Sequence, residues 1–287
     1  MIMLRGAIIH RRRIEVLARH AACAASFSSD SEEVRGKVCL VVGAGSGIGA
    51  AVARKFAAEG YVTAIVRRSD TEKLHKLRDS IRQSAGECHA FQIDATKEGS
   101  LQGLVQEIES SIGPIACAVY NLGAQLGSRD IERTTPKLFE RAMRLGAFGA
   151  YELARSLAGP MTKRGSGTII FTGATAGLRG NAGQHAHAAG MFARRALAQS
   201  LGHELGAHGI HIAHVVVDGM VDSPDTLGKM MPELFQNLKK EKMPLQGIIM
   251  PKDVADAMFY LHGQPRSSWT SEMDLRPWQD TAWYNTS

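Results

Sequence analysis

The chain has 287 residues, of which 44% are hydrophobic and 22% charged. This composition is ordinary for a globular protein whose core needs no disulfide or metal to hold it. The net charge of +6 arises mainly in residues 1–29, which contain five arginines and one acid, whereas the rest has 29 basic and 27 acidic residues. The total charge therefore does not indicate a nucleic-acid surface, and no apolar run approaches the roughly 20 residues of a transmembrane helix.

Residues 1–30 have the composition of a mitochondrial targeting presequence. Arginine recurs, acids are almost absent, apolar residues have helical spacing, and an Ala/Ser-rich stretch closes the segment. We therefore expect import to the matrix side of the mitochondrion, with cleavage between Arg19 and Ser31. A basic tail without such an address is the alternative. A single folded domain is expected over residues 31–287.

A glycine-rich turn opens this domain. The stretch VVGAGSGIG joins an apolar strand pattern over residues 37–43 to a helical pattern over residues 47–60. In that context the glycines permit a tight turn, close approach of backbone N–H groups to a pyrophosphate, and close packing of helix on strand. The start of the helix also favours negative charge. The candidate dinucleotide contacts in this turn are Gly43, Gly45, Ser46, Gly47, Ile48 and Gly49.

The second apolar run, residues 61–66, ends beside two arginines. An NAD(H) site needs a carboxylate at this point to hold the ribose 2′-hydroxyl, whereas a cation suits the 2′-phosphate of NADP(H). Arg67 and Arg68 therefore favour NADP(H) over NAD(H). Asp70 lies slightly further along the chain and leaves NAD(H) open as the alternative.

Strand and helix patterns continue to alternate through the rest of the chain. Further strands are expected at 88–93, 115–120, 167–172 and 211–217, with a seventh in the closing SSWTSEMDLRPW, and helices at 71–86, 100–113, 136–163 and 190–209. This alternation predicts an α/β fold with a Rossmann-type, doubly wound parallel seven-stranded sheet and helices on both faces. Residues 222–250 break the rhythm and are expected to form a lid. The four cysteines form no C-x-x-C pair, so no metal site is expected.

From about Gly36 to Trp278 the sequence resembles the short-chain dehydrogenase/reductase family. The family's glycine motif appears as VGAGSGIG, its turn after the third strand as DAT, and its motif after the fourth strand as YNLG. Its turn after the sixth strand appears as VVVDG, where Asp218 replaces a proline. The resemblance implies further cofactor contacts at Asp94, Ala95, Asn121, Gly123, Thr172 and Gly219.

The same resemblance implies a reaction centre of asparagine, serine, tyrosine and lysine, in which tyrosine exchanges a proton and lysine lowers its pKa. Those four positions fall on Gly146, Ala174, His187 and Met191, so all four residues are substituted. Residues 164–228 contain no tyrosine or lysine that could take their place. Because methionine and alanine offer no donor, little turnover is expected.

Two functions are compatible with this pattern. The first is a catalytically degenerate NADP(H)-binding protein that serves as an accessory subunit of a mitochondrial assembly such as a respiratory complex, by analogy of fold. The second is an active NADP(H)-dependent carbonyl reductase or alcohol dehydrogenase, in which His187 is the acid–base group and Thr172 or Thr175 holds the substrate oxygen. The expected partners are a dinucleotide and either proteins of a mitochondrial complex or a second copy of the chain.

Overall fold

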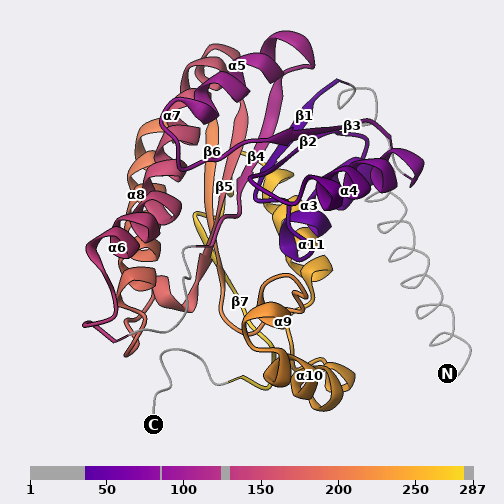
Figure 1. Ribbon diagram of the computed structural model, residues 1–287. Helices are drawn as coiled ribbons and strands as arrows, with labels where there is room; N and C mark the ends of the chain where they lie inside the picture. The colour runs from indigo at the N-terminus through magenta and orange to yellow at the C-terminus, as the bar shows by residue number, and fades with distance from the viewer. Residues whose placement is uncertain (1–35, 85, 124–129, 281–287) are drawn as a thin grey trace, which may run out of the picture. The chain divides into compact units, whose positions relative to one another are not determined.

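The structure is a computed structural model that describes residues 36–84, 86–123 and 130–280. The presequence predicted at residues 1–30 lies outside the described residues. Seven parallel strands form one sheet in the order β3-β2-β1-β4-β5-β6-β7 (Figure 1). Their bounds are β1 Val38–Val42, β2 Val62–Arg67, β3 Cys88–Gln92, β4 Ile115–Tyr120, β5 Gly167–Ala174, β6 Ile210–Val217 and β7 Glu272–Leu275. The predicted doubly wound, seven-stranded sheet is confirmed.

Helices cover both faces of the sheet (Figure 1). On one face lie α3 Ile48–Ala58, α4 Thr71–Ser84 and α11 Pro251–His262, and on the other lie α5 Ser100–Ser111, α7 Gly149–Arg164 and α8 His185–Gly206. Helix α11 was not predicted from the sequence. This helix packs on α3, and the rings of Phe259 and Phe56 meet edge to face with centroids 5.2 Å apart.

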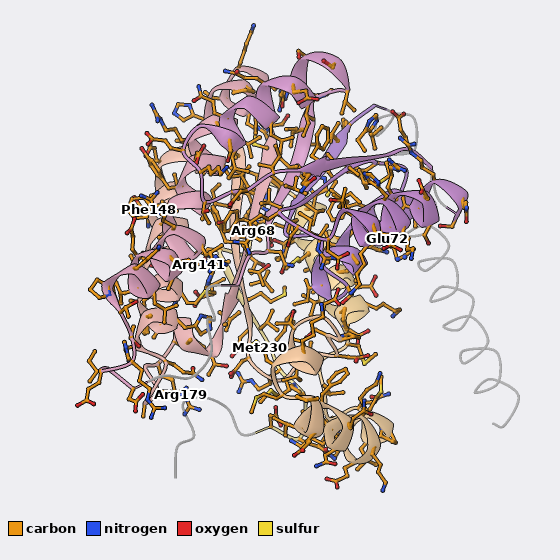
Figure 2. The ribbon with its side chains drawn as sticks, in the orientation of Figure 1. Arg68, Glu72, Arg141, Phe148, Arg179 and Met230 are labelled. Atoms are coloured by element: carbon orange, nitrogen blue, oxygen red, sulfur yellow. The ribbon has the colours of Figure 1, made fainter. Side chains whose placement is uncertain are left out.

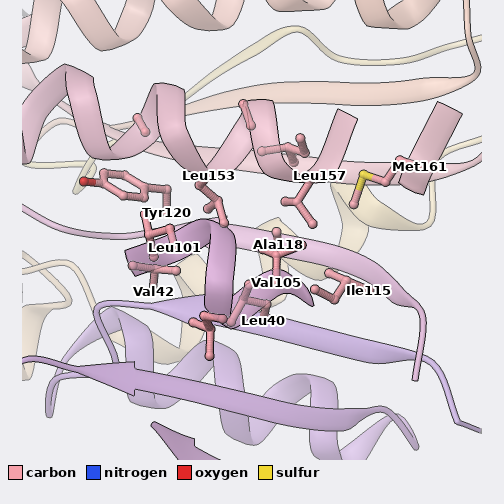
Figure 3. Close-up of a cluster of buried hydrophobic side chains, with 14 of the residues drawn as sticks. Leu40, Val42, Leu101, Val105, Ile115, Ala118, Tyr120, Leu153, Leu157 and Met161 are labelled. Carbon is pink, nitrogen blue, oxygen red and sulfur yellow. The ribbon is translucent and has the colours of Figure 1, made fainter. Parts of the chain in front are cut away.

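The central strands are buried on both faces, as strands of a parallel sheet usually are. Figure 3 shows side chains from β1 and β4, including Leu40 and Tyr120, packed with residues of α5 and α7 such as Val105 and Leu157. All of these side chains are fully or almost fully buried. Cys39, Cys88 and Cys117 are likewise buried and unlinked, in agreement with a packing role.

The helical stretch predicted over residues 136–163 is divided by a π-helical turn. It consists of α6 Pro136–Met143, the π-helical segment η1 Arg144–Phe148, and α7. A Cβ atom built on Gly146 within η1 would lie 2.6 Å from the Cα of Gly190 in α8. The interruption thus coincides with a close approach of the two backbones that only glycine permits.

The segment predicted as a lid contains short helices. These are α9 Leu227–Met230, α10 Pro232–Glu241 and the 3-10 turn η3 Met243–Leu245. A β-bridge between Val221 and Ile249 closes the base of the segment. None of the helices in the described ranges is long and apolar enough to span a bilayer.

Candidate functional site

A cleft of about 550 Å³ opens at the carboxyl ends of β1, β2, β4 and β5. The strand order reverses between β1 and β4, and doubly wound sheets bind their ligands at that point. Most of the cofactor residues predicted from sequence line this cleft: Gly43, Gly45, Gly47, Ile48, Gly49, Arg67, Arg68, Asp94, Ala95, Asn121, Gly123, Thr172 and Gly219. Ser46 lies outside the cleft lining, and its Oγ accepts a hydrogen bond from the backbone N–H of Asp225 at 3.3 Å.

The glycine loop is held by its neighbours in a fixed shape. Gly43 has a φ of +100°, a conformation that side chains rarely allow, and its carbonyl oxygen accepts a hydrogen bond from Asn121 Nδ2 at 3.1 Å. A Cβ on Gly49 would lie 2.2 Å from the same oxygen, so α3 can start this close to β1 only with glycine. At Gly45 there is open space, with no atom within 4 Å of a Cβ built there.

The first turn of α3 carries no negative charge of its own. Its N-cap, Gly47, makes no side-chain cap, and the first turn of the helix contains no acidic residue. The first N–H groups of a helix have no partner within the helix, and its dipole favours negative charge there. The loop therefore fits a pyrophosphate group, because Gly45, Gly47 and Ile48 line the cleft and a Cβ built on Gly45 would meet no atom within 4 Å.

The two arginines at the end of β2 differ in their surroundings. Arg67 Nη2 lies 3.5 Å from an oxygen of Asp70 and 3.4 Å from one of Asp225. Arg68 forms no ion pair with any residue that the structure describes, and it lines the cleft together with Arg141 of α6 (Figure 2). Burial raises the pKa of the Asp94 carboxyl, but hydrogen bonds from Thr96 and the charge of Arg68 outweigh it, so that this pKa is lowered.

Three of the four substituted catalytic positions lie together. Ala174, His187 and Met191 all line the cleft, and Thr172 lies beside them with a buried hydroxyl that has no hydrogen-bond partner among the described residues. Gly146 is buried and lies away from the cleft surface, in η1. Because a Cβ there would collide with α8, the present backbone has no room for an asparagine.

The hydroxyl of Thr175 points elsewhere. It donates a hydrogen bond to Asp218 Oδ1 at 2.5 Å, and the residue is not part of the cleft lining. Of the two threonines considered for holding a substrate oxygen, Thr172 is therefore the one whose hydroxyl the structure leaves available.

A buried cation, Arg194, forms part of the cleft lining and was not predicted from the sequence. Its side chain is fully buried and donates four hydrogen bonds of 2.7–2.8 Å to backbone carbonyls, those of Leu122, Leu145, Gly146 and Thr172. The guanidinium also lies 4.8 Å from the ring centroid of Tyr120. Burial lowers the pKa of Arg194 to about 10, so the group stays charged at neutral pH.

The sequence contains a pattern from which the role of Arg194 could have been predicted. His187, Met191 and Arg194 are spaced four and three residues apart, which places them on one face of α8. A charged residue on the buried face of an Ala-rich helix is costly unless its donors are satisfied, so it marks an internal site. Further cleft residues that the sequence analysis did not single out are Leu122, Arg141, Val221, Ser223 and Thr226.

No group of three or more metal-ligating side chains occurs in the described part of the chain. The cleft is lined by the glycine loop at the start of α3, by Arg67 and Arg68 at the end of β2, and by Thr172, whose hydroxyl has no hydrogen-bond partner among the described residues. This donor set fits a nicotinamide dinucleotide.

Comparisons with known proteins agree with this geometry. Residues 37–231 match the family model described as short chain dehydrogenase. The chain is 27% identical over 245 residues to the 7alpha-hydroxysteroid dehydrogenase of Escherichia coli (strain K12), covering 85% of this chain and 94% of that protein. It is 29% identical over 229 residues to the 3-oxoacyl-[acyl-carrier-protein] reductase of Bos taurus, covering 80% and 92%. A crystal structure of a short-chain dehydrogenase from Rhodopseudomonas palustris superimposes with a TM-score of 0.71 at 33% identity, covering 85% of this chain and all of that one.

Proposed function

The chain belongs to the short-chain dehydrogenase family, and on that premise we propose that it is an NADP(H)-binding member whose reaction centre is degenerate. One observation supports this most directly. The cleft keeps the glycine loop and the cations at the end of β2, whereas Gly146, Ala174 and Met191 offer no side-chain donor to a substrate or a relay.

The residues that line the cleft can be assigned to different parts of a bound dinucleotide. The loop from Gly43 to Gly49 would hold the pyrophosphate, Arg68 the 2′-phosphate, and Asp94 and Ala95 the adenine side. Asn121 holds the loop through its hydrogen bond to Gly43, and the hydroxyl of Thr172 would face the nicotinamide half of the dinucleotide. When bound, the dinucleotide supplies or accepts a hydride.

The loss of acid–base groups explains why little turnover is expected. A positioned acid or base contributes about 10²–10⁴ in rate, and its pKa must be tuned to the working pH. Met191 is almost fully buried and cannot perform that tuning. Arg194 supplies a charge in the cleft lining, but four of its five N–H groups are already bonded to backbone carbonyls.

The choice of phosphorylated cofactor rests on Arg68. In the variant Arg68→Ala we expect the Kd for NADPH to rise about tenfold, as the loss of about 1.4 kcal/mol implies, with a much smaller change for NADH. NADPH and NADH fluorescence titrations measure both constants. Arg155→Ala, an exposed arginine on α7, is the matched control. An equal change for both dinucleotides in Arg68→Ala would contradict the assignment.

A mitochondrial location and a structural role in a larger assembly complete the proposal. They are supported by the arginine-rich, acid-poor composition of residues 1–30 and by the degenerate reaction centre. Fractionated mitochondria run on native gels should place the protein in a high-mass complex that retains dinucleotide. Recovery of the protein only in small, free form or outside mitochondria would contradict this part.

A second function is favoured by one specific observation. His187 and Thr172 both line the cleft, and the buried hydroxyl of Thr172 has no partner among the described residues. An imidazole can donate or accept a proton, and a free hydroxyl can hold a carbonyl oxygen. The alternative is therefore an NADP(H)-dependent carbonyl reductase or alcohol dehydrogenase that uses His187 as its acid–base group.

A further inference from the structure

A carboxylate of the lid segment, residues 222–250, forms ion pairs with cations beside the glycine loop. Asp225 lies between β6 and α9, and its Oδ1 is 2.6 Å from Lys73 Nζ and 3.4 Å from Lys229 Nζ. Its Oδ2 is 3.4 Å from Arg67 Nη2, and its backbone N–H donates to Ser46 Oγ. The side chain is only 12% exposed. One carboxylate is thus surrounded by three cations and by the end of the nucleotide loop.

The elements that meet at Asp225 define an anion site. Ser46 comes from the glycine loop, Arg67 from the end of β2, and Lys73 from the first turn of α4, three segments that are close together only in the fold. In doubly wound folds the 2′-phosphate of a dinucleotide is accommodated by a cation at the end of the second strand, near the loop that binds the pyrophosphate. The carboxylate of Asp225 therefore lies where such a phosphate is expected.

We propose that Asp225 occupies the 2′-phosphate site in the ligand-free protein, and that NADP(H) binds by displacing this carboxylate and releasing the lid from the nucleotide loop. The proposal rests on the function proposed above, since it assumes that the cleft binds a dinucleotide. Asp225 becomes a residue that sets cofactor preference. A 2′-phosphate held by Arg68 must compete with Asp225 for the neighbouring cations Arg67 and Lys73, whereas the uncharged 2′-hydroxyl of NAD(H) has no such charge to accommodate.

The charge on Asp225 makes this competition effective. Hydrogen bonding to Lys73 holds the pKa of the Asp225 carboxyl far below its usual range, so the group is ionised at any physiological pH. Two anions at one site repel each other, and the repulsion weakens little with salt when the groups are partly buried. The phosphate therefore gains Arg67 and Lys73, which also lie 3.5 Å from Asp70 Oδ2, only when the Asp225 carboxylate has moved away.

The same segment provides an internal comparison. Asp222, three residues earlier, is similarly enclosed at 15% exposure, but its partner is Lys239 of α10, at 3.5 Å. That ion pair stays within the lid segment, residues 222–250. Asp225 differs because it connects the lid segment to β2 and α4. Substituting Asp222 therefore removes a contact within the lid segment, whereas substituting Asp225 removes a contact between that segment and the rest of the fold.

The experiment uses the full chain with Asp225→Asn, with Asp222→Asn as the matched control. Fluorescence titration gives the Kd for NADPH and for NADH. We expect Asp225→Asn to lower the Kd for NADPH about tenfold, equivalent to about 1.4 kcal/mol, and to change the Kd for NADH less than twofold. Asp222→Asn should change neither Kd. An unchanged ratio of the two constants, or a selective loss of NADH affinity in Asp225→Asn, would overturn the inference.

Hydrogen exchange of residues 222–230 tests the release of the lid independently. We expect faster exchange in ligand-free Asp225→Asn and in Lys73→Met, which removes the shortest ion pair from the other side. In the native chain NADPH should accelerate this exchange and NADH should not, and protection by NADPH would contradict the release. Native protein that binds neither dinucleotide would overturn the proposed function together with this inference. Native protein that binds both, with no selective gain in Asp225→Asn, would overturn the inference alone.

Discussion

Arg194→Met removes the buried cation in the cleft lining and keeps an apolar stem of similar length. The carbonyl oxygens of Leu122, Gly146 and Thr172 then lose the hydrogen bond from the guanidinium, as does that of Leu145, which still accepts one from Tyr120 Oη at 2.9 Å. A hydrogen bond to a charged group contributes about 1.5–3 kcal/mol. These losses are offset in part because the desolvation cost of the guanidinium, several kcal/mol, is also removed. The expected net loss is about 3 kcal/mol, out of about 5–15 kcal/mol for a typical domain.

Urea unfolding followed by tryptophan fluorescence at pH 7 measures this loss. Arg155→Met replaces an exposed arginine on the neighbouring helix α7 and should stay within about 0.5 kcal/mol of the native protein. Arg194→Lys keeps the charge but not the planar fork of donors, and should fall between the two. A loss below about 1 kcal/mol in Arg194→Met would refute the view that the guanidinium stabilises the junction of η1, α8 and the loop after β4.

Three further predictions concern the cleft and its supports. Gly45→Ala adds a methyl group in open space, so the unfolding free energy should change by less than about 0.5 kcal/mol while dinucleotide affinity, measured by titration, falls at least about tenfold; unchanged affinity would place the ligand elsewhere. Gly146→Asn forces a side chain against the Cα of Gly190 and should lower the unfolding midpoint by the equivalent of several kcal/mol, whereas a stable variant would show that η1 can move. Burial lowers the pKa of His262 from 6.5 to about 4, so the unfolded chain binds the extra proton and stability falls by about 2–3 kcal/mol as pH drops from about 6.5 to 4. In His262→Gln the free energy of unfolding, measured from unfolding curves across that pH range, should depend less on pH than in the native protein. An equal pH dependence in the two proteins would refute this account.

Much of the fold could be predicted because its signals are local. The central strands are short, largely apolar runs, and the glycine loop stands directly between the first strand and the first helix. Helix α11 was missed although it carries a signal, since Pro251 opens it and Val254, Met258 and Leu261 share one buried face. Its position after the irregular segment 222–250 concealed that periodicity.

The parts of the site that escaped prediction depend on contacts between distant residues. Asp225 meets Lys73 and Ser46 across 152 and 179 positions of the chain, and no local pattern marks such a pair. The carbonyl contacts of Arg194 depend on the π-helical turn η1, which the periodicity of residues 136–163 does not distinguish from an ordinary helix. Motifs indicate which residues face the cleft, whereas the fold decides which of their charges are already neutralised.

The central claim is that the cleft binds NADP(H) without efficient turnover. The most direct measurement supplies the purified protein with NADPH and a broad panel of carbonyl compounds and records both NADPH binding and oxidation, in parallel with His187→Phe. We expect saturable binding in both proteins and no carbonyl-dependent oxidation above the level of the variant. Robust oxidation that disappears in His187→Phe would contradict the account and establish the chain as an active reductase.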